Sequence, residues 1–177
     1  MRTAVRTHTF SESVIRGMTR LANEHGAINL AQGFPNFPAP DVLKHAAAQA
    51  IHDDINQYAI TWGSERLRRA IVAKYAAWYG MTVDPVAEIT VTCGATEAMA
   101  SVMLALVNPG DEVVVLEPFY ENYGPDAVLC DARPVYVPFR PGESLDLDRL
   151  AAAFGPKTRA IIVNSPNNKK TFLIAPP

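Results

Sequence analysis

The second half of the chain alternates between short apolar runs and segments with helical periodicity, and this alternation constrains the fold more than any other feature. The apolar runs are residues 89–93, 112–116, 134–137 and 160–164. The run at 112–116 has apolar residues at consecutive positions, as is usual for a strand that is covered on both faces. Strands that are separated by helices form parallel sheets with right-handed crossover connections. The sequence therefore predicts an α/β fold.

Several segments have the apolar spacing of helices, and residues typical of helix ends flank them. These segments are residues 11–25, 40–53, 65–79, 96–107, 120–130 and 147–154. Ser64 is a candidate N-cap, and Gly80 suits the turn that ends a helix. Ser11 is the expected N-cap of the first helix. Residues 32–40 contain three prolines and a glycine, so an extended loop is expected there.

Charge and hydropathy exclude several function classes. The chain has 16 basic and 18 acidic residues, and this balance favours neither nucleic acid nor an anionic membrane as a partner. No apolar run approaches the roughly 18 residues of a transmembrane helix, and the N-terminus lacks the apolar segment of a signal peptide. Cys93 and Cys130 lie in apolar segments and are expected to be buried thiols of a reducing compartment. These features predict a cytoplasmic protein.

Polar segments follow three of the predicted strands, at the sheet edge where open α/β folds bind ligands. Residues 93–97 combine a glycine turn with a helix start, which suits a phosphate. On spacing alone, an ordinary turn with Thr96 as the N-cap fits them better. The aromatic residues in 117–123 would stack on a flat ring or pack in the core. The carboxamides in 164–168 would bind a polar ligand or form a turn.

Taken together, these segments resemble the class I pyridoxal-phosphate aminotransferases of fold type I. The matching motifs are Gln32–Pro35, Asn56–Tyr58, Gly94–Ala98, Asn108–Val113, Glu117–Tyr123 and Asn164–Asn168. The most similar branch contains the kynurenine, glutamine and methionine aminotransferases, and the resemblance covers residues 10–168. It implies a three-layer α/β/α architecture with an incomplete, mostly parallel sheet from the large domain of that fold.

The resemblance also implies a cofactor site for pyridoxal 5′-phosphate. Ala95 and Thr96 would hold the phosphate through backbone N–H groups and the Thr96 hydroxyl. Tyr120 would stack on the pyridine ring, and Asn168 would bond the 3-oxygen of that ring. No metal site is expected, and the four histidines match no motif of the family.

Three further residues would bind the substrates. Gly33 would let the loop backbone approach the substrate carboxylate, and Ile15 would line the substrate pocket. Tyr58 would reach across the interface of a homodimer into the partner's site. The implied reaction transfers an amino group from an amino acid to a 2-oxo acid in a biosynthetic process.

The resemblance ends after Asn168, where the family continues with Pro-Thr-Gly-Lys. No catalytic residue is assigned, because the family's Schiff-base lysine has no counterpart in the matched region. Lys170 precedes Thr-Phe as that lysine often does, but it matches the sequence that follows Pro-Thr-Gly equally well. We therefore expect an inactive N-terminal fragment: an arm and small-domain segment (1–40), the first half of the large domain (41–168) and an aberrant tail (169–177).

Two other functions fit the same residues. One is a carbon–sulfur β-lyase on the same fold, and the other is the non-catalytic, cofactor-binding half of a split enzyme. In the family's sheet the strands at 134–137, 112–116 and 160–164 are neighbours in that order. The strand at 89–93 belongs at the far edge, where no other strand of this chain would pair with it. We therefore expect marginal stability or aggregation.

Overall fold

The computed structural model describes residues 2–33, 35–139 and 145–165. The chain divides into two compact units. Unit 1 consists of the segments Met1–Ser13 and Cys93–Pro177, and unit 2 is Val14–Thr92. Within the described ranges, no helix combines the length and apolar character that crossing a bilayer requires.

A parallel sheet forms the centre of unit 1. Its strands are β1 (Glu112–Glu117), β2 (Arg133–Pro138) and β3 (Thr158–Ile162), in the order β2-β1-β3. Both pairings of β1 are parallel. The predicted order of these three neighbouring strands is therefore confirmed.

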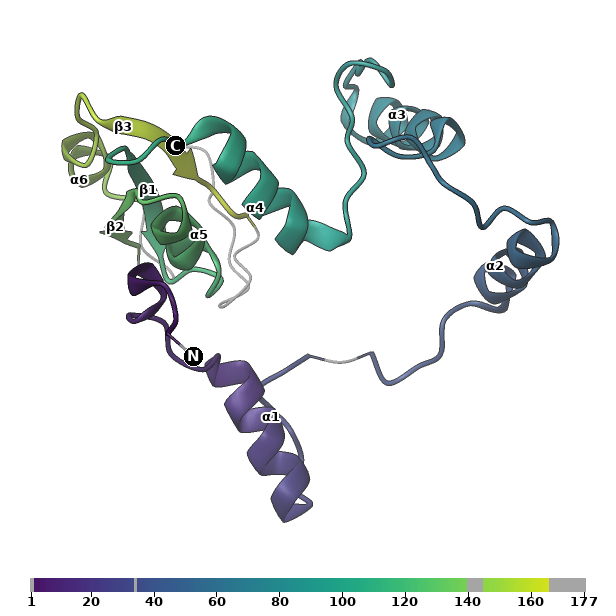
Figure 1. Ribbon diagram of the computed structural model, residues 1–177, viewed down its shortest axis with the longest axis horizontal. Coiled ribbons are helices and arrows are strands. Elements are labelled where there is room, and N and C mark those ends of the chain that lie inside the picture. Colours follow the sequence, from purple (N-terminus) through teal and green to yellow (C-terminus); the bar gives the residue numbers. More distant parts are fainter. Residues whose placement is uncertain (1, 34, 140–144, 166–177) are drawn as a thin grey trace. The chain divides into compact units, whose positions relative to one another are not determined.

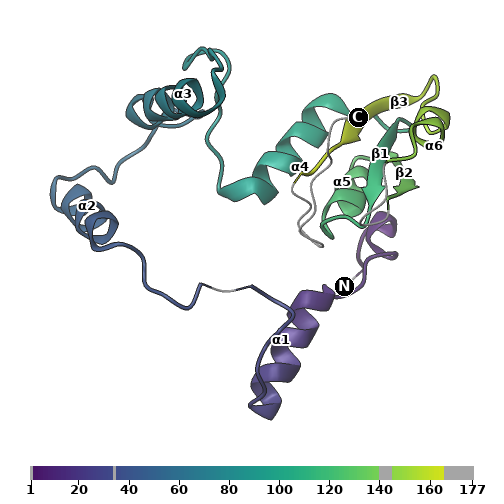
Figure 2. The same ribbon diagram turned by 180° about the vertical axis from the view of Figure 1, so that it is seen from behind.

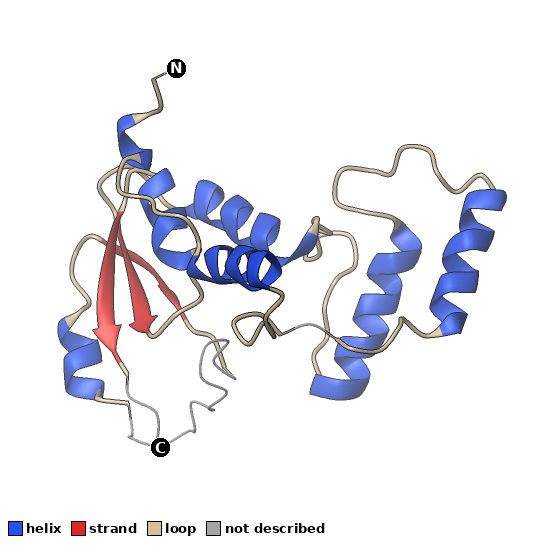
Figure 3. Ribbon diagram, turned by 90° about the horizontal axis from the view of Figure 1, so that it is seen from below, coloured by secondary structure: helices blue, strands red, loops and turns tan. Residues whose placement is uncertain are grey.

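Helices cover both faces of this sheet, as Figure 3 shows. On one face, Val113 and Val115 of β1 pack in a core with residues of α4 (Gly94–Leu106) and with Ala127 of α5 (Tyr123–Leu129). On the other face, Val114 and Leu116 pack in a core that includes Leu150 of α6 (Leu147–Ala152) and Ala153 just after it. These four β1 side chains are all buried. The predicted three-layer α/β/α arrangement is confirmed.

The predicted strand at 89–93 is wrong for the described structure. These residues are not assigned to a strand, and Val91 instead donates its backbone N–H to the carbonyl of Trp62 in unit 2. A strand needs a neighbouring strand to form its ladder of hydrogen bonds. None of the described strands pairs with this segment.

Unit 2 contains the helices α1 (Val14–His25), α2 (Asp41–His52) and α3 (Glu65–Tyr79), which Figures 1 and 2 show from opposite sides. The predicted ends of α3 are confirmed: Ser64 Oγ accepts the Leu67 N–H at 3.3 Å, and Gly80 is left-handed with φ 64°. α1 begins at Val14 rather than at the residue after the expected cap, Ser11.

Candidate functional site

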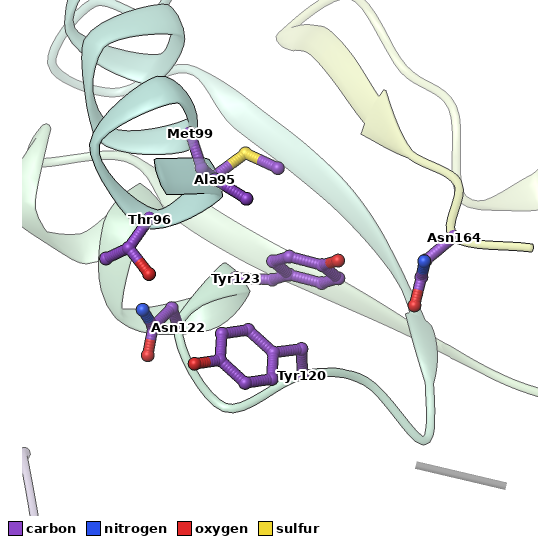
Figure 4. Close-up of a pocket in the computed structure, with 7 residues that line it drawn as sticks. All are labelled: Ala95, Thr96, Met99, Tyr120, Asn122, Tyr123 and Asn164. Atoms are coloured by element: carbon purple, nitrogen blue, oxygen red, sulfur yellow. The ribbon is translucent and has the colours of Figure 1, made fainter. Parts of the chain in front are cut away.

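A cavity of about 380 Å³ lies in unit 1, near the N-terminus of α4 and the carboxyl ends of β1 and β3 (Figure 4). It is lined by Ala95, Thr96, Met99, Tyr120, Asn122, Tyr123 and Asn164. The aromatic segment, residues 119–123, follows β1, and Asn164 follows β3. The cavity is therefore at the sheet edge where α/β folds bind ligands.

The N-terminus of α4 gives the cavity a wall suited to an anion. Gly94 begins the helix with a left-handed backbone, φ 83°, which glycine adopts without strain. The first N–H groups of an α-helix have no partner inside the helix, and the helix dipole is positive at this end. Ala95 and Thr96 belong to this first turn and line the cavity.

Thr96 is not the N-cap, contrary to the alternative that the sequence left open. The N-cap is Cys93, and its side chain caps no N–H group. The Glu97 carboxylate accepts the backbone N–H of Cys93 instead. The Thr96 side chain is therefore available to the cavity, where Figure 4 shows it facing Asn122. Cys93 is exposed, so its expected burial is wrong, whereas Cys130 is buried as expected.

Aromatic rings form the wall opposite the helix. The rings of Tyr120 and Tyr123 meet edge to face, with centroids 5.9 Å apart. Burial raises the pKa of Tyr123, and the neighbouring Tyr120 raises it further, so the Tyr123 phenol stays protonated at neutral pH. Figure 4 shows the Tyr123 ring between Met99 and Asn164. Next to this wall, Phe119 stacks on Tyr136 with centroids 5.1 Å apart and the ring planes 3° from parallel.

The lining fits a flat, phosphorylated ring. The helix N-terminus and the Thr96 hydroxyl supply donors for a phosphate, and the two tyrosines supply an apolar surface for a ring. The Asn164 carboxamide faces the cavity from the β3 side in Figure 4. None of the seven lining residues is charged. Within the described lining, an anion would therefore be held by hydrogen bonds and by the helix dipole.

The structure brings three of the predicted cofactor residues together, since Ala95, Thr96 and Tyr120 line one cavity. Asn168 lies outside the described residues, as do Lys170 and the tail 169–177. The three predicted substrate residues belong to unit 2, Ile15 in α1 and Gly33 and Tyr58 in loops. Their roles remain predictions.

Sequence reasoning singled out four of the lining residues either not at all or only as members of a longer polar segment. Asn122, Tyr123 and Asn164 lie inside the polar segments that follow β1 and β3, so their position in the chain was a usable signal. Met99 lies four residues after Ala95 in α4, which places both on one face of the helix. The spacing of Met99 was therefore the signal for this residue.

The chain matches a model of a known protein family. The family model described as "Aminotransferase class I and II" matches residues 25–171. The chain is 44% identical over 169 residues to the Mycobacterium tuberculosis protein named "Probable N-succinyldiaminopimelate aminotransferase DapC", with 94% of this chain and 43% of that protein covered. It is 36% identical to human kynurenine–oxoglutarate transaminase 1, with 84% of this chain and 39% of that protein covered.

Solved structures agree with this match. The N-succinyldiaminopimelate aminotransferase of M. tuberculosis superposes with a TM-score of 0.90 at 43% identity, covering 95% of this chain and 44% of that chain. YbdL of Escherichia coli, described as a methionine aminotransferase, superposes with a TM-score of 0.91 at 34% identity, covering 98% of this chain and 46% of that chain.

The chain thus spans less than half the length of these relatives, which confirms the expectation that it holds part of a family member. The resemblance drawn from the sequence motifs is also confirmed. The chain belongs to the class I and II aminotransferase family.

Proposed function

We propose that the cavity binds pyridoxal 5′-phosphate and that a full-length family member containing this chain uses the cofactor to transfer an amino group from an amino acid to a 2-oxo acid. The observation that supports this most is the placement of Ala95 and Thr96, at a helix N-terminus, opposite Tyr120 and Tyr123 across one cavity. The two walls have the chemistry that the two ends of this cofactor require. The family match supports the same proposal.

Several of the lining residues have a task in this proposal. The Thr96 hydroxyl and the N–H groups of the first α4 turn bind the phosphate, because both donate hydrogen bonds toward an anion. Tyr120 covers one face of the pyridine ring and excludes water from it. Tyr123 keeps its proton and donates a hydrogen bond at the ring edge. When bound, the cofactor supplies an electron sink for breaking the C–H bond of the carbon that carries the amino group.

No lysine is among the seven residues that line the cavity, all of which lie in the described part of the chain. The family's reaction needs a lysine amine that moves the proton between carbon atoms. We therefore propose that these 177 residues alone bind the cofactor without completing the transfer.

Location and assembly belong to the same proposal. Cys93 and Cys130 are both free thiols, which fits the cytoplasm, where thiols stay reduced. Tyr58 is fully exposed in this chain. That exposure fits a residue that reaches into the site of a partner in a homodimer.

Calorimetric titration of the purified chain tests cofactor binding. The first probe is 4′-deoxypyridoxine 5′-phosphate, which has no aldehyde and cannot react with surface lysines. We expect saturable binding that weakens in Thr96→Val and in Tyr120→Ala. Pyridoxine, which has no phosphate, should bind more weakly than the phosphorylated probe.

The matched control is Ser101→Ala, a change at an exposed position of the same helix beyond its first turn. Its affinity for the probe should equal that of the wild type. Absence of saturable binding, or affinities that Thr96→Val and Tyr120→Ala leave unchanged, would overturn the proposal.

A further inference from the structure

The N-terminal arm, residues 2–13, contacts the cavity's aromatic segment and the far end of the helix that follows it. At one contact, Ser13 Oγ donates a hydrogen bond to the Glu121 carboxylate at 2.5 Å. At the other, Arg6 Nη1 donates to the Leu129 carbonyl and lies 3.3 Å from the Asp131 carboxylate, with which it forms an ion pair. The arm therefore spans α5 from the residues before it to the residues after it.

The arm has its own local order between these contacts. Its short 3₁₀ helix, η1 (Val5–Thr7), packs against α5, and Figures 1 and 2 show the two elements next to each other from opposite sides. Thr7 donates to the Ala4 carbonyl through its hydroxyl at 2.7 Å and through its N–H at 3.0 Å. These bonds close the turn that contains Arg6.

The Ser13 contact lies in the middle of the aromatic segment. Glu121 lies between Tyr120 and Asn122 in the chain, and both neighbours line the cavity, whereas Glu121 does not. Ser13 and Glu121 are both half-buried. A hydrogen bond to a carboxylate is stronger than one between neutral groups, so it restrains the backbone on both sides of Glu121.

The Arg6 contact restrains the other end of the same helix. α5 has seven residues, and helices this short are unstable unless other contacts hold them. Arg6 binds the carbonyl of its last residue, Leu129, and the side chain of Asp131, whose backbone is left-handed with φ 55°. Tyr123, the first residue of α5, is thereby held from both directions.

We propose that Ser13 and Arg6 are positioning residues, which hold the Tyr120–Tyr123 side chains in the geometry that receives the cofactor ring. The choice of ligand rests on the proposed function, and the contacts themselves do not. The phosphate end of the cavity is built by α4, whereas the two contacts described above join the arm to Glu121, Leu129 and Asp131. The arm therefore acts on ring binding and not on phosphate binding.

The binding test compares two probes in three variants. In Ser13→Ala, we expect about fivefold weaker binding of 4′-deoxypyridoxine 5′-phosphate, the fold-change that corresponds to one lost hydrogen bond. Affinity for inorganic phosphate should stay unchanged. Ser13→Thr keeps a hydroxyl and should restore the wild-type value. Ser11→Ala, an exposed position in the same arm, is the matched control.

Hydrogen exchange of the ligand-free protein tests the contacts without a ligand. Amides of residues 119–124 should exchange faster in Ser13→Ala than in the wild type, and amides of residues 127–131 should exchange faster in Arg6→Ala. Amides of β1 should keep their protection in both variants. Faster exchange confined to these segments supports the positioning role.

The two measurements separate the inference from the proposed function. If the wild type fails to bind the analogue, the proposed function is wrong, and the exchange data alone decide the role of the arm. Unchanged exchange at 119–124 in Ser13→Ala overturns the inference. Parallel loss of phosphate and analogue binding, or loss of protection in β1, also overturns it, because the substitution would then act on the whole fold.

Discussion

Gly124 lies where α5 and β2 come so close together that a Cβ atom would not fit. A Cβ at this position would lie 2.5 Å from the Tyr136 hydroxyl oxygen and 3.5 Å from the ring carbon that carries it. Glycine inside a helix is unfavourable by itself, but here the close approach of β2 to α5 requires it. The Phe119–Tyr136 stack holds that hydroxyl in place.

We expect Gly124→Ala to lower the free energy of unfolding by about 1–3 kcal/mol, the usual range for overpacking. Adding Tyr136→Phe should recover most of this loss, because an ordinary 3.5 Å contact then remains. Urea unfolding of the two single variants and the double variant measures the coupling. Gly155→Ala, where a Cβ meets no atom within 4 Å, is the control. Additive losses would show that the hydroxyl is not the obstacle.

The buried carboxyl of Asp126 is a second group of α5 that affects the stability of the fold. It is buried in α5, and its Oδ2 has no hydrogen-bond partner among the described residues. Burial raises the pKa of its carboxyl above the ordinary value of 3.8. The folded state therefore keeps the proton to a higher pH than the unfolded state does, and ionisation at higher pH destabilises the fold.

Asp126→Asn should accordingly raise the free energy of unfolding at neutral pH by about 1 kcal/mol, because it removes a buried charge and keeps the shape of the side chain. The gain should shrink as the pH falls below the raised pKa of the folded state, and it should be lost below 3.8, where both states of the wild type are protonated. Urea unfolding from pH 7 downward measures this trend. Asp148→Asn, at an exposed position, should show no such trend. A gain that grows on acidification would contradict the assignment.

At the scale of elements, α3 depends on its N-cap. Ser64→Ala removes the hydrogen bond to the Leu67 N–H, and we expect the helix to lose about 1 kcal/mol of stability. Hydrogen exchange of the first-turn amides of α3 should become faster. Ser64→Asp keeps an acceptor and should restore the wild-type exchange rate. Equal rates in Ser64→Ala and the wild type would mean that the cap adds nothing.

The same helix shows what local sequence is able to predict. Both ends of α3 are set by residues next to it, Ser64 and Gly80, so a local pattern was sufficient. The strands β1, β2 and β3 were predictable because apolar runs require burial on two faces. The segment 89–93 alternates apolar residues with threonine, which also favours a strand, but a strand needs a partner, and the pattern of one segment cannot show whether a partner exists.

The candidate site was predictable to the extent that it depends on sequence motifs. Ala95, Thr96 and Tyr120 lie in motifs and line the cavity together. The anchoring of the aromatic segment by Ser13 joins residues 108 positions apart. No local pattern marks such a pair, because the fold alone brings these residues into contact.

At the scale of the whole molecule, helix α4 is apolar on more than the side that faces the sheet. Met103 packs in the core and is 3% exposed, whereas Leu104, its neighbour in the chain, is 72% exposed. Val102 and Leu106 on the same helix are also about half exposed. β2 and β3 are edge strands of the described sheet. Exposed apolar surface and unpaired strand edges both promote association between chains.

Substitutions at these neighbouring positions distinguish core from outer surface. Met103→Gln should lower the free energy of unfolding by about 2–5 kcal/mol, because it removes a buried apolar group and buries a polar one. Leu104→Gln should leave that free energy nearly unchanged. In sedimentation velocity at increasing protein concentrations, its monomer fraction should exceed that of the wild type at each concentration. If Leu104→Gln costs as much stability as Met103→Gln, the outer side of α4 is packed within the protein. Association would then have to arise at the strand edges.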